Sequence, residues 1–217
     1  MIAAEAYELW AATWDEDAGA LVALESAWMS PWLEDIAGAL VIDVGCGTGR
    51  WLVELRERGA TAFGFDFSPA MLAKAAGKGL FVAVADLRGL PLPSLCAEIV
   101  VCALSIGHVP DAGEAIRELA RLVKPGGTLL LSDFHPDAYR RGWRRTFRQA
   151  GKVHEVQHYP HSAAELIAAA SESGLVLAEL VEPGFDRRQE EFFRRAGKQL
   201  EAVQGLPALL LARWRRP

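Results

Sequence analysis

Three aspartates beside apolar segments are the residues of this sequence best suited to bind a polar ligand. Asp43 precedes a glycine-rich turn, whereas Asp66 and Asp86 follow later apolar segments. The glycines at positions 45, 47 and 49 allow a sharp turn and let a ligand approach the backbone where a Cβ would collide. A helix that starts directly after this turn would offer its free N–H groups to the same ligand.

The spacing of these residues favours a nucleoside ligand. Asp66 follows Gly45 by roughly 20 residues, the distance at which an acid that binds ribose follows a nucleotide-binding turn. One carboxylate can accept hydrogen bonds from both the 2′- and the 3′-hydroxyl. The alternative is that Asp66 only caps the helix that Ser68 and Pro69 begin. Arg50 stands where a dinucleotide-binding G-x-G-x-x-G turn has its last glycine, which argues against a nicotinamide-dependent oxidoreductase.

Short apolar segments alternate with helical periodicity along most of the chain. Residues 39–44 are rich in β-branched side chains, as expected of a parallel strand covered on both faces, and residues 48–58 have helical spacing. Further strands are expected at residues 62–66, 80–85, 97–104, 128–133, 176–182 and 206–214. This alternation predicts a mostly parallel sheet between two layers of helices, with ligands bound at the carboxyl ends of the strands.

The run D-x-G-x-G-x-G at residues 43–49 resembles motif I of the class I S-adenosylmethionine (SAM)-dependent methyltransferases. The acids at 66 and 86, and the K-P-G-G turn at residues 124–127, extend the resemblance over residues 39–133. The sequence looks closest to the small-molecule branch that includes ubiquinone- and menaquinone-biosynthesis methyltransferases.

The resemblance implies a three-layer α/β/α, Rossmann-like fold with a seven-stranded, mostly parallel sheet whose last strand is antiparallel. It implies SAM as methyl donor, S-adenosylhomocysteine (SAH) as product, and a small molecule as acceptor through an oxygen, nitrogen or carbon atom. Asp86 would contact the adenine amino group, and its apolar neighbour would pack on the ring. The cofactor-binding residues implied are Tyr7, Trp14, Asp43, Gly45, Cys46, Gly47, Gly49, Asp66, Phe67, Met71, Asp86, Leu87, Ala103 and Leu104.

The chain of 217 residues has the length of one ordinary domain. We expect a helical cap at residues 1–37, the cofactor-binding core at 39–133, an acceptor-side segment at 134–161, and helices and edge strands at 162–217. Residues 187–204 are expected to form a charged amphipathic helix inserted before the last strand.

Tyr7, Trp10 and Trp14 have helical spacing near the start of the chain. They are interpreted either as helix packing across the sheet edge or as a cap over the cofactor. The second interpretation comes from the resemblance, because a similar Y-x-x-W-A-x-x-[YW]-D segment covers the methionine end in many small-molecule methyltransferases.

His108 and His135 follow the expected fourth and fifth strands and are the candidates for general-base catalysis. Methyl transfer from a sulfonium is a one-step displacement, so a base is needed only if the nucleophile carries a proton. His108 is preferred, since the loop after the fourth strand commonly faces the transferred methyl in the resembling family. The alternative for each is a loop histidine that forms only local hydrogen bonds.

Five arginines and a histidine pair stand in the expected acceptor-side segment. Arg140 to Arg148 are either a solvated helix face or a site for an anionic acceptor, because arginine grips carboxylate and phosphate bidentately. His154 and His158 match the zinc motif H-E-x-x-H, but Pro160 and the preceding residues predict an extended chain. Positions four apart in a strand are roughly 13 Å apart, too far to share one zinc, so no metal is expected.

Composition excludes several classes of protein. The formal net charge of −5 argues against nonspecific nucleic-acid binding, and residues 103–106 lack the N/D-P-P-Y/F run of nucleic-acid amine methyltransferases. The three cysteines form neither a disulfide framework nor a zinc motif, and no membrane span or signal segment is expected, so a cytoplasmic setting is predicted. A noncatalytic protein that binds SAM or a nucleoside, a nucleic-acid methyltransferase, and any oligomeric state remain open alternatives.

Overall fold

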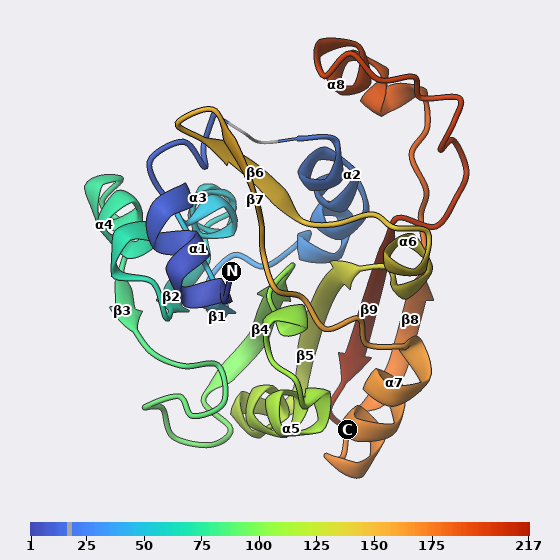
Figure 1. The fold of residues 1–217 in the computed structure, drawn as a ribbon. Helices are drawn as coiled ribbons and strands as arrows, with labels where there is room; N and C mark the ends of the chain where they lie inside the picture. Colours follow the sequence, from blue (N-terminus) through green and yellow to red (C-terminus); the bar gives the residue numbers. More distant parts are fainter. Residues whose placement is uncertain (17–18) are drawn as a thin grey trace.

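A seven-stranded sheet with the order β3-β2-β1-β4-β5-β9-β8 forms the centre of the computed structural model, which describes residues 1–16 and 19–217 (Figure 1). Pairing is parallel from β3 through β5, whereas β9 is antiparallel to both of its neighbours. The predicted mostly parallel sheet with an antiparallel last strand is therefore confirmed. The strands are β1 Leu40–Val44, β2 Thr61–Asp66, β3 Val82–Val84, β4 Ala97–Ala103, β5 Val123–Phe134, β8 Val176–Val181 and β9 Leu209–Arg215.

Side chains along each strand alternate between the two faces of the sheet, and a layer of helices packs on each face. Ile42 of β1 packs into an apolar cluster with α5 and α7, and its neighbour Val41 packs into a second cluster with α2 and α3. The helices are α1 Ala3–Trp10, α2 Ala20–Met29, α3 Arg50–Glu57, α4 Pro69–Gly77, α5 Ala112–Leu122, α6 Pro136–Arg140, α7 Ala163–Glu172 and α8 Glu190–Arg195, with 3-10 turns η1 Ser30–Leu33, η2 Ile106–His108 and η3 Arg187–Gln189.

Polar side chains cap the starts of three helices, α4, α5 and α7. Ser68 accepts from the N–H of Met71 at the start of α4, and Ser162 and Glu165 form a reciprocal capping box at α7. At the start of α5, Asp111 accepts from the Glu114 N–H without a bond in return. These caps fix where helices meet the sheet.

The N-terminal segment and residues 134–161 lie against each other. Beyond α6, the chain forms a hairpin of β6 Thr146–Gln149 and β7 Lys152–Glu155, whose Phe147 stacks on Trp10 of α1 with ring centroids 4.8 Å apart. The helical interpretation of Arg140–Arg148 is therefore wrong, since only Arg140 belongs to α6. Residues 17 and 18, within the expected cap of residues 1–37, lie outside the described residues.

Two further expectations need correction. The helix expected at residues 187–204 ends at Arg195, because Gly197 takes a positive φ of 65° and closes the last turn. The strand expected at residues 80–85 is shorter, Val82–Val84, and its exposed Val84 marks it as a sheet edge. None of the helices in residues 1–16 and 19–217 has the length and apolar character needed to cross a membrane.

Candidate active site

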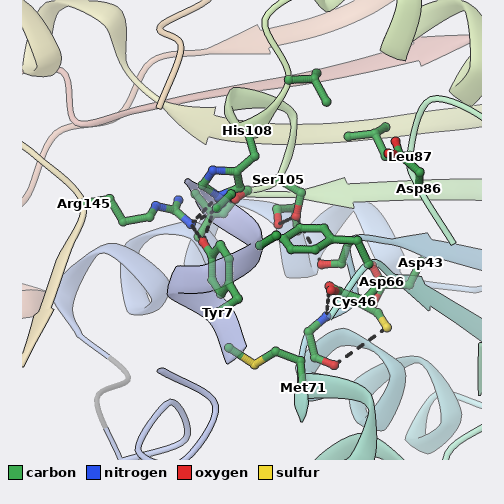
Figure 2. A pocket seen from close by; sticks show the side chains of 18 of the residues that line it. Tyr7, Asp43, Cys46, Asp66, Met71, Asp86, Leu87, Ser105, His108 and Arg145 are labelled. Atoms are coloured by element: carbon green, nitrogen blue, oxygen red, sulfur yellow. Dashed lines mark hydrogen bonds between the residues drawn. The ribbon is translucent and has the colours of Figure 1, made fainter. Parts of the chain in front are cut away.

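A cavity of about 420 Å³ opens at the carboxyl ends of β1, β2 and β4, beneath α1. The chain continues from β1 to β2 on one side and returns to β4 on the other, so this edge is where the strand order reverses. We call it the sheet-edge cavity. Figure 2 shows Tyr7, His108 and Arg145 grouped together in it, with Asp43, Asp66 and Cys46 further along.

All but two of the candidate site residues line the sheet-edge cavity. Those that line it are Tyr7, Trp14, Asp43, Gly45, Cys46, Gly47, Asp66, Phe67, Met71, Asp86, Leu87, Ala103, Leu104 and His108. Gly49 and His135 are not among its lining residues. Ser105, Gln157 and Tyr159 also line it and were not selected from the sequence, and so does Arg145, which belongs to the cluster considered for an anionic acceptor.

The glycine turn is built for close approach. A Cβ on Gly45 would lie 2.2 Å from Oγ of Ser105, whereas nothing lies within 4 Å of a Cβ on Gly47, whose φ is +54°. A Cβ on Gly49 would instead lie 2.3 Å from Cδ1 of Leu80. Gly49 therefore serves the packing of the turn on its neighbours, while the first two glycines shape the cavity wall.

Asp66 joins the end of β2 to the glycine turn. Its two carboxylate oxygens accept from the N–H groups of Gly47 and Ser68, each at 2.8 Å. Burial raises the pKa of Asp66, and these backbone hydrogen bonds counteract part of that rise. Asp66 therefore both caps the entry to α4 and lines the cavity. Each of its carboxylate oxygens retains a lone pair for a ligand hydroxyl.

Asp43 is a buried carboxylate without a partner. Its side chain is 1% exposed, and neither oxygen has a hydrogen-bond partner among residues 1–16 and 19–217. Burial raises its pKa to about 7, and the nearby Arg50 opposes that rise. Arg50 itself pairs with Glu25 at 2.5 Å. A buried, unpartnered acid beside a cavity fits a cationic ligand, which would supply the missing charge.

Asp86 differs from the other two acids because it already has a partner. Arg88 donates to it from its backbone N–H and from Nε and Nη2, and these bonds lower the pKa of Asp86. The side chain is about half exposed in this ion pair. Leu87 and Ala85 supply an apolar wall beside it.

Tyr7, His108 and Arg145 form a hydrogen-bonded chain in the cavity. The Tyr7 hydroxyl lies 2.8 Å from Nε2 of His108 and accepts from Nη1 of Arg145 at 2.7 Å. Nδ1 of His108 faces the carbonyl oxygen of Gln157 at 3.2 Å. Because a carbonyl only accepts, the proton of the neutral ring belongs on Nδ1, and Nε2 carries the lone pair.

Burial sets the protonation state of this chain. Desolvation, followed by the charge of Arg145, holds the pKa of His108 well below its usual value. Burial also raises the pKa of Tyr7, with Arg145 acting in the opposite direction. At neutral pH the histidine is therefore uncharged and the tyrosine is protonated.

His135 has a different place. It caps α6, where Nδ1 accepts from the Asp137 N–H at 3.0 Å and Nε2 lies 3.1 Å from Glu182. Both ring nitrogens are thus occupied by local partners, as in the alternative stated for a loop histidine. Of the two histidines, only His108 lines the sheet-edge cavity.

The residues of the H-E-x-x-H match lie on an extended segment, as predicted. His154 is in β7 and stacks on Phe147, with ring centroids 5.1 Å apart. His158 lies beyond the strand, 3.8 Å from Asp133. The described residues hold no group of three or more His, Cys, Asp or Glu side chains that could bind a metal ion.

The seven-stranded, mostly parallel sheet with one antiparallel strand between neighbours is the fold shared with solved SAM-dependent methyltransferases. The chain belongs to the methyltransferase-domain family, whose model matches residues 18–180. The protein is therefore a SAM-dependent methyltransferase, and SAM is its methyl donor. The unpartnered Asp43 fits the positive charge of this cofactor, and the glycine turn leaves room for its backbone contacts.

The curated relatives and the solved structure that resemble this chain are also methyltransferases. The chain is 32% identical over 171 residues to a ubiquinone biosynthesis O-methyltransferase of Pseudomonas aeruginosa, covering 69% of this chain and 71% of that protein. It is 38% identical over 120 residues to the enzyme of the same name from Pseudomonas paraeruginosa, covering 50% of this chain and 52% of that protein. A SAM-dependent methyltransferase structure from Mesorhizobium loti aligns with a TM-score of 0.70 and 22% identity, covering 92% of this chain and 99% of that one.

Proposed function

We propose that this enzyme transfers the methyl group of SAM to a small molecule enclosed under a cap of α1 and the β6–β7 hairpin. The observation that carries the proposal is the aromatic cluster of that cap. Trp10 stacks on Phe147, and Tyr7 and Trp14 line the sheet-edge cavity beneath them. A site roofed in this way suits a compact ligand better than a polymer.

The relatives named O-methyltransferases support a hydroxyl as the nucleophile, and the site offers a group to take its proton. When bound, SAM supplies a methyl group on a positively charged sulfur. The protein then aligns the acceptor oxygen with that methyl and excludes water. Nε2 of His108, whose lone pair meets the Tyr7 hydroxyl, accepts the proton that the oxygen loses, either directly or through Tyr7.

We propose cofactor roles for all three acids; those of Asp66 and Asp86 were predicted from the sequence, and that of Asp43 follows from its burial without a partner. Asp66 would accept from the ribose hydroxyls and Asp43 would face the positive charge of the methionine end. Asp86 would contact the adenine amino group only if it shares its carboxylate with Arg88, which now holds it. The methylation of nucleic acids is the less favoured alternative, because Ala103–Ile106 carries no N/D-P-P-Y/F run and the formal net charge is −5.

The proposal is tested by measuring SAH binding calorimetrically and then methyl transfer from methyl-labelled SAM to small phenols, amines and oligonucleotides. We expect label in at least one small phenol and none in oligonucleotides. Gly45→Val should abolish both binding and transfer, because its Cβ meets Ser105. Gly77→Ala, a helical position with nothing within 4 Å of the added Cβ, is the matched control. Label confined to oligonucleotides would refute the proposal.

A further inference from the structure

A second cavity, of about 500 Å³, adjoins the sheet-edge cavity. The two share part of their walls, so a ligand in one would adjoin a ligand in the other. The shared lining residues are Trp14, Val22, Arg50, Leu104 and Arg145. A cofactor in the sheet-edge cavity would leave this second cavity for another molecule of moderate size.

Four cationic side chains line the second cavity, and they differ in what neutralises them. Three have carboxylate partners among residues 1–16 and 19–217: Arg50 with Glu25 at 2.5 Å, Lys78 with Asp15 at 2.8 Å, and Arg144 with Glu155 at 3.5 Å. Arg145 has no ion pair within 4 Å in the described part of the chain. The carboxylates of Asp133 and Glu25 act on it only through space.

The guanidinium of Arg145 is also incompletely hydrogen-bonded. Of its nitrogens only Nη1 has hydrogen-bond partners among described residues: it donates to the Tyr7 hydroxyl at 2.7 Å and to the carbonyl oxygen of Leu104 at 3.1 Å, and it lies 3.5 Å from Nε2 of His108. Nη2 has no hydrogen-bond partner there. The edge formed by Nε and Nη2 is the fork with which arginine binds both oxygens of a carboxylate.

The remaining walls suit a flat apolar body. Trp10 and Trp14 line the second cavity and meet edge to face, with ring centroids 4.5 Å apart. Leu21, Val22 and Leu104 complete an apolar surface. Aromatic rings pack well on such surfaces, and the combination of tryptophans with one arginine that lacks a carboxylate partner among the described residues favours an aromatic acid.

We propose that the second cavity binds the methyl acceptor, and that this acceptor is a small aromatic carboxylate held by Arg145. This rests on the proposed function, since it assigns the acceptor of the same site. Arg145 lines both cavities, so a carboxylate bound to it would lie at their shared wall and leave the rest of the acceptor free to reach the sheet-edge cavity. The ring would extend along Trp14, which borders both cavities.

The test uses the protein saturated with SAH and a matched pair of probes, 3,4-dihydroxybenzoate and 3,4-dihydroxybenzamide, titrated by calorimetry. The two probes share a shape and differ in charge. We expect the carboxylate to bind about tenfold more tightly or better. Arg145→Met should remove this preference while the SAH affinity stays within about twofold. Arg148→Met, an exposed arginine of β6, should preserve the preference.

Arg145→Lys guards against misfolding of the methionine variant, because it keeps the charge and loses the fork. It should show a reduced but measurable preference for the carboxylate. Equal affinities, or no binding of either probe, in the wild-type SAH complex would overturn the proposal. So would a wild-type preference in both Arg145 variants, or loss of SAH binding in folded Arg145→Met. Failure of the wild-type protein to bind SAH would instead refute the proposed function.

Discussion

The hydroxyl oxygen of Tyr7 lies 2.8 Å from Nε2 of His108, although the two residues are 101 positions apart in the sequence. The nitrogen that would act as base is thus already in contact with a hydroxyl. A proton leaving the acceptor must either displace Tyr7 from this contact or pass through it. The pair therefore links the helical cap to the loop after β4.

Replacing His108 should separate chemistry from cofactor binding. We expect His108→Ala to lower turnover by roughly 10²-fold or more, while the SAM affinity stays within about twofold. His135→Asn is the matched control, because asparagine can still cap α6 and should leave turnover within about twofold. Steady-state kinetics and calorimetry measure both effects. Unchanged turnover in His108→Ala would mean that the acceptor arrives already deprotonated.

The pH dependence of turnover should reflect the lowered pKa of His108. A base whose pKa lies well below 6.5 stays uncharged as the pH falls from 8 to 6.5, so its protonation should not reduce the rate there. Because the pKa of His108 is lower in the folded than in the unfolded state, keeping this ring neutral contributes to the free energy of unfolding. That contribution is complete above pH 6.5 and is lost as the pH falls toward the pKa of the folded state. Histidine titration followed by NMR would check this. A His108 pKa at or above 6.5 would contradict the buried environment.

Asp66→Ala should weaken SAM binding by about 1.5–3 kcal/mol, because the ribose hydroxyls would lose a charged acceptor. The same change frees the N–H groups of Gly47 and Ser68, so the thermal stability of the cofactor-free protein must be measured alongside. The exposed Glu34→Gln serves as the charge control. Calorimetry that finds unchanged affinity in folded Asp66→Ala would exclude the ribose role.

Asp43→Asn should stabilise the cofactor-free protein while weakening SAM binding. Burial raises the pKa of Asp43 to about 7. The folded protein is therefore destabilised as the pH rises above the ordinary pKa of an aspartate, and this destabilisation is complete once the pH passes 7. The stabilisation should be on the order of 2–4 kcal/mol at pH 8 and smaller at pH 5. Thermal unfolding at both pH values, with Glu34→Gln beside it, is the measurement. An equal effect at the two pH values would argue against an ionised Asp43.

The purified protein should contain no stoichiometric zinc, and a chelator should leave methyl transfer intact. His154 is in a strand and stacks on Phe147, whereas His158 lies beside Asp133, so the two rings have separate surroundings. Metal analysis by mass spectrometry decides the matter. About one zinc ion per chain that disappears in His154→Ala would contradict the prediction.

The sheet and most of the residues that line the sheet-edge cavity were predictable, because short stretches of sequence determine them. Buried parallel strands are short apolar runs, and the turn after β1 needs glycine at positive φ. The motif does not distinguish the roles of its glycines, however. Gly45 and Gly49 have similar φ values and both make room for a side chain distant in the sequence, Ser105 and Leu80 respectively, yet only Gly45 lines the cavity.

The β6–β7 hairpin over the site was not predicted, because the run of arginines was interpreted as a helix face and the turn that follows it was overlooked. Ala150 and Gly151 both have positive φ and join β6 to β7 as a two-residue loop, for which Gly151 was the available sign. No feature of the sequence selects Arg145 from five neighbouring arginines. Its position depends on the hairpin lying over α1 and Leu104, which is a consequence of tertiary packing.

The place of β9 between β5 and β8 has a consequence for how the protein is made. Among the described strands β8 pairs only with β9, so residues 176–181 wait without a strand partner while the ribosome adds residues up to 209–215. The cofactor edge, built from β1, β2 and β4, is by then already synthesised. During translation, the nascent chain therefore exposes the outer edge of β5, where a chaperone or a second nascent chain could pair before β9 does.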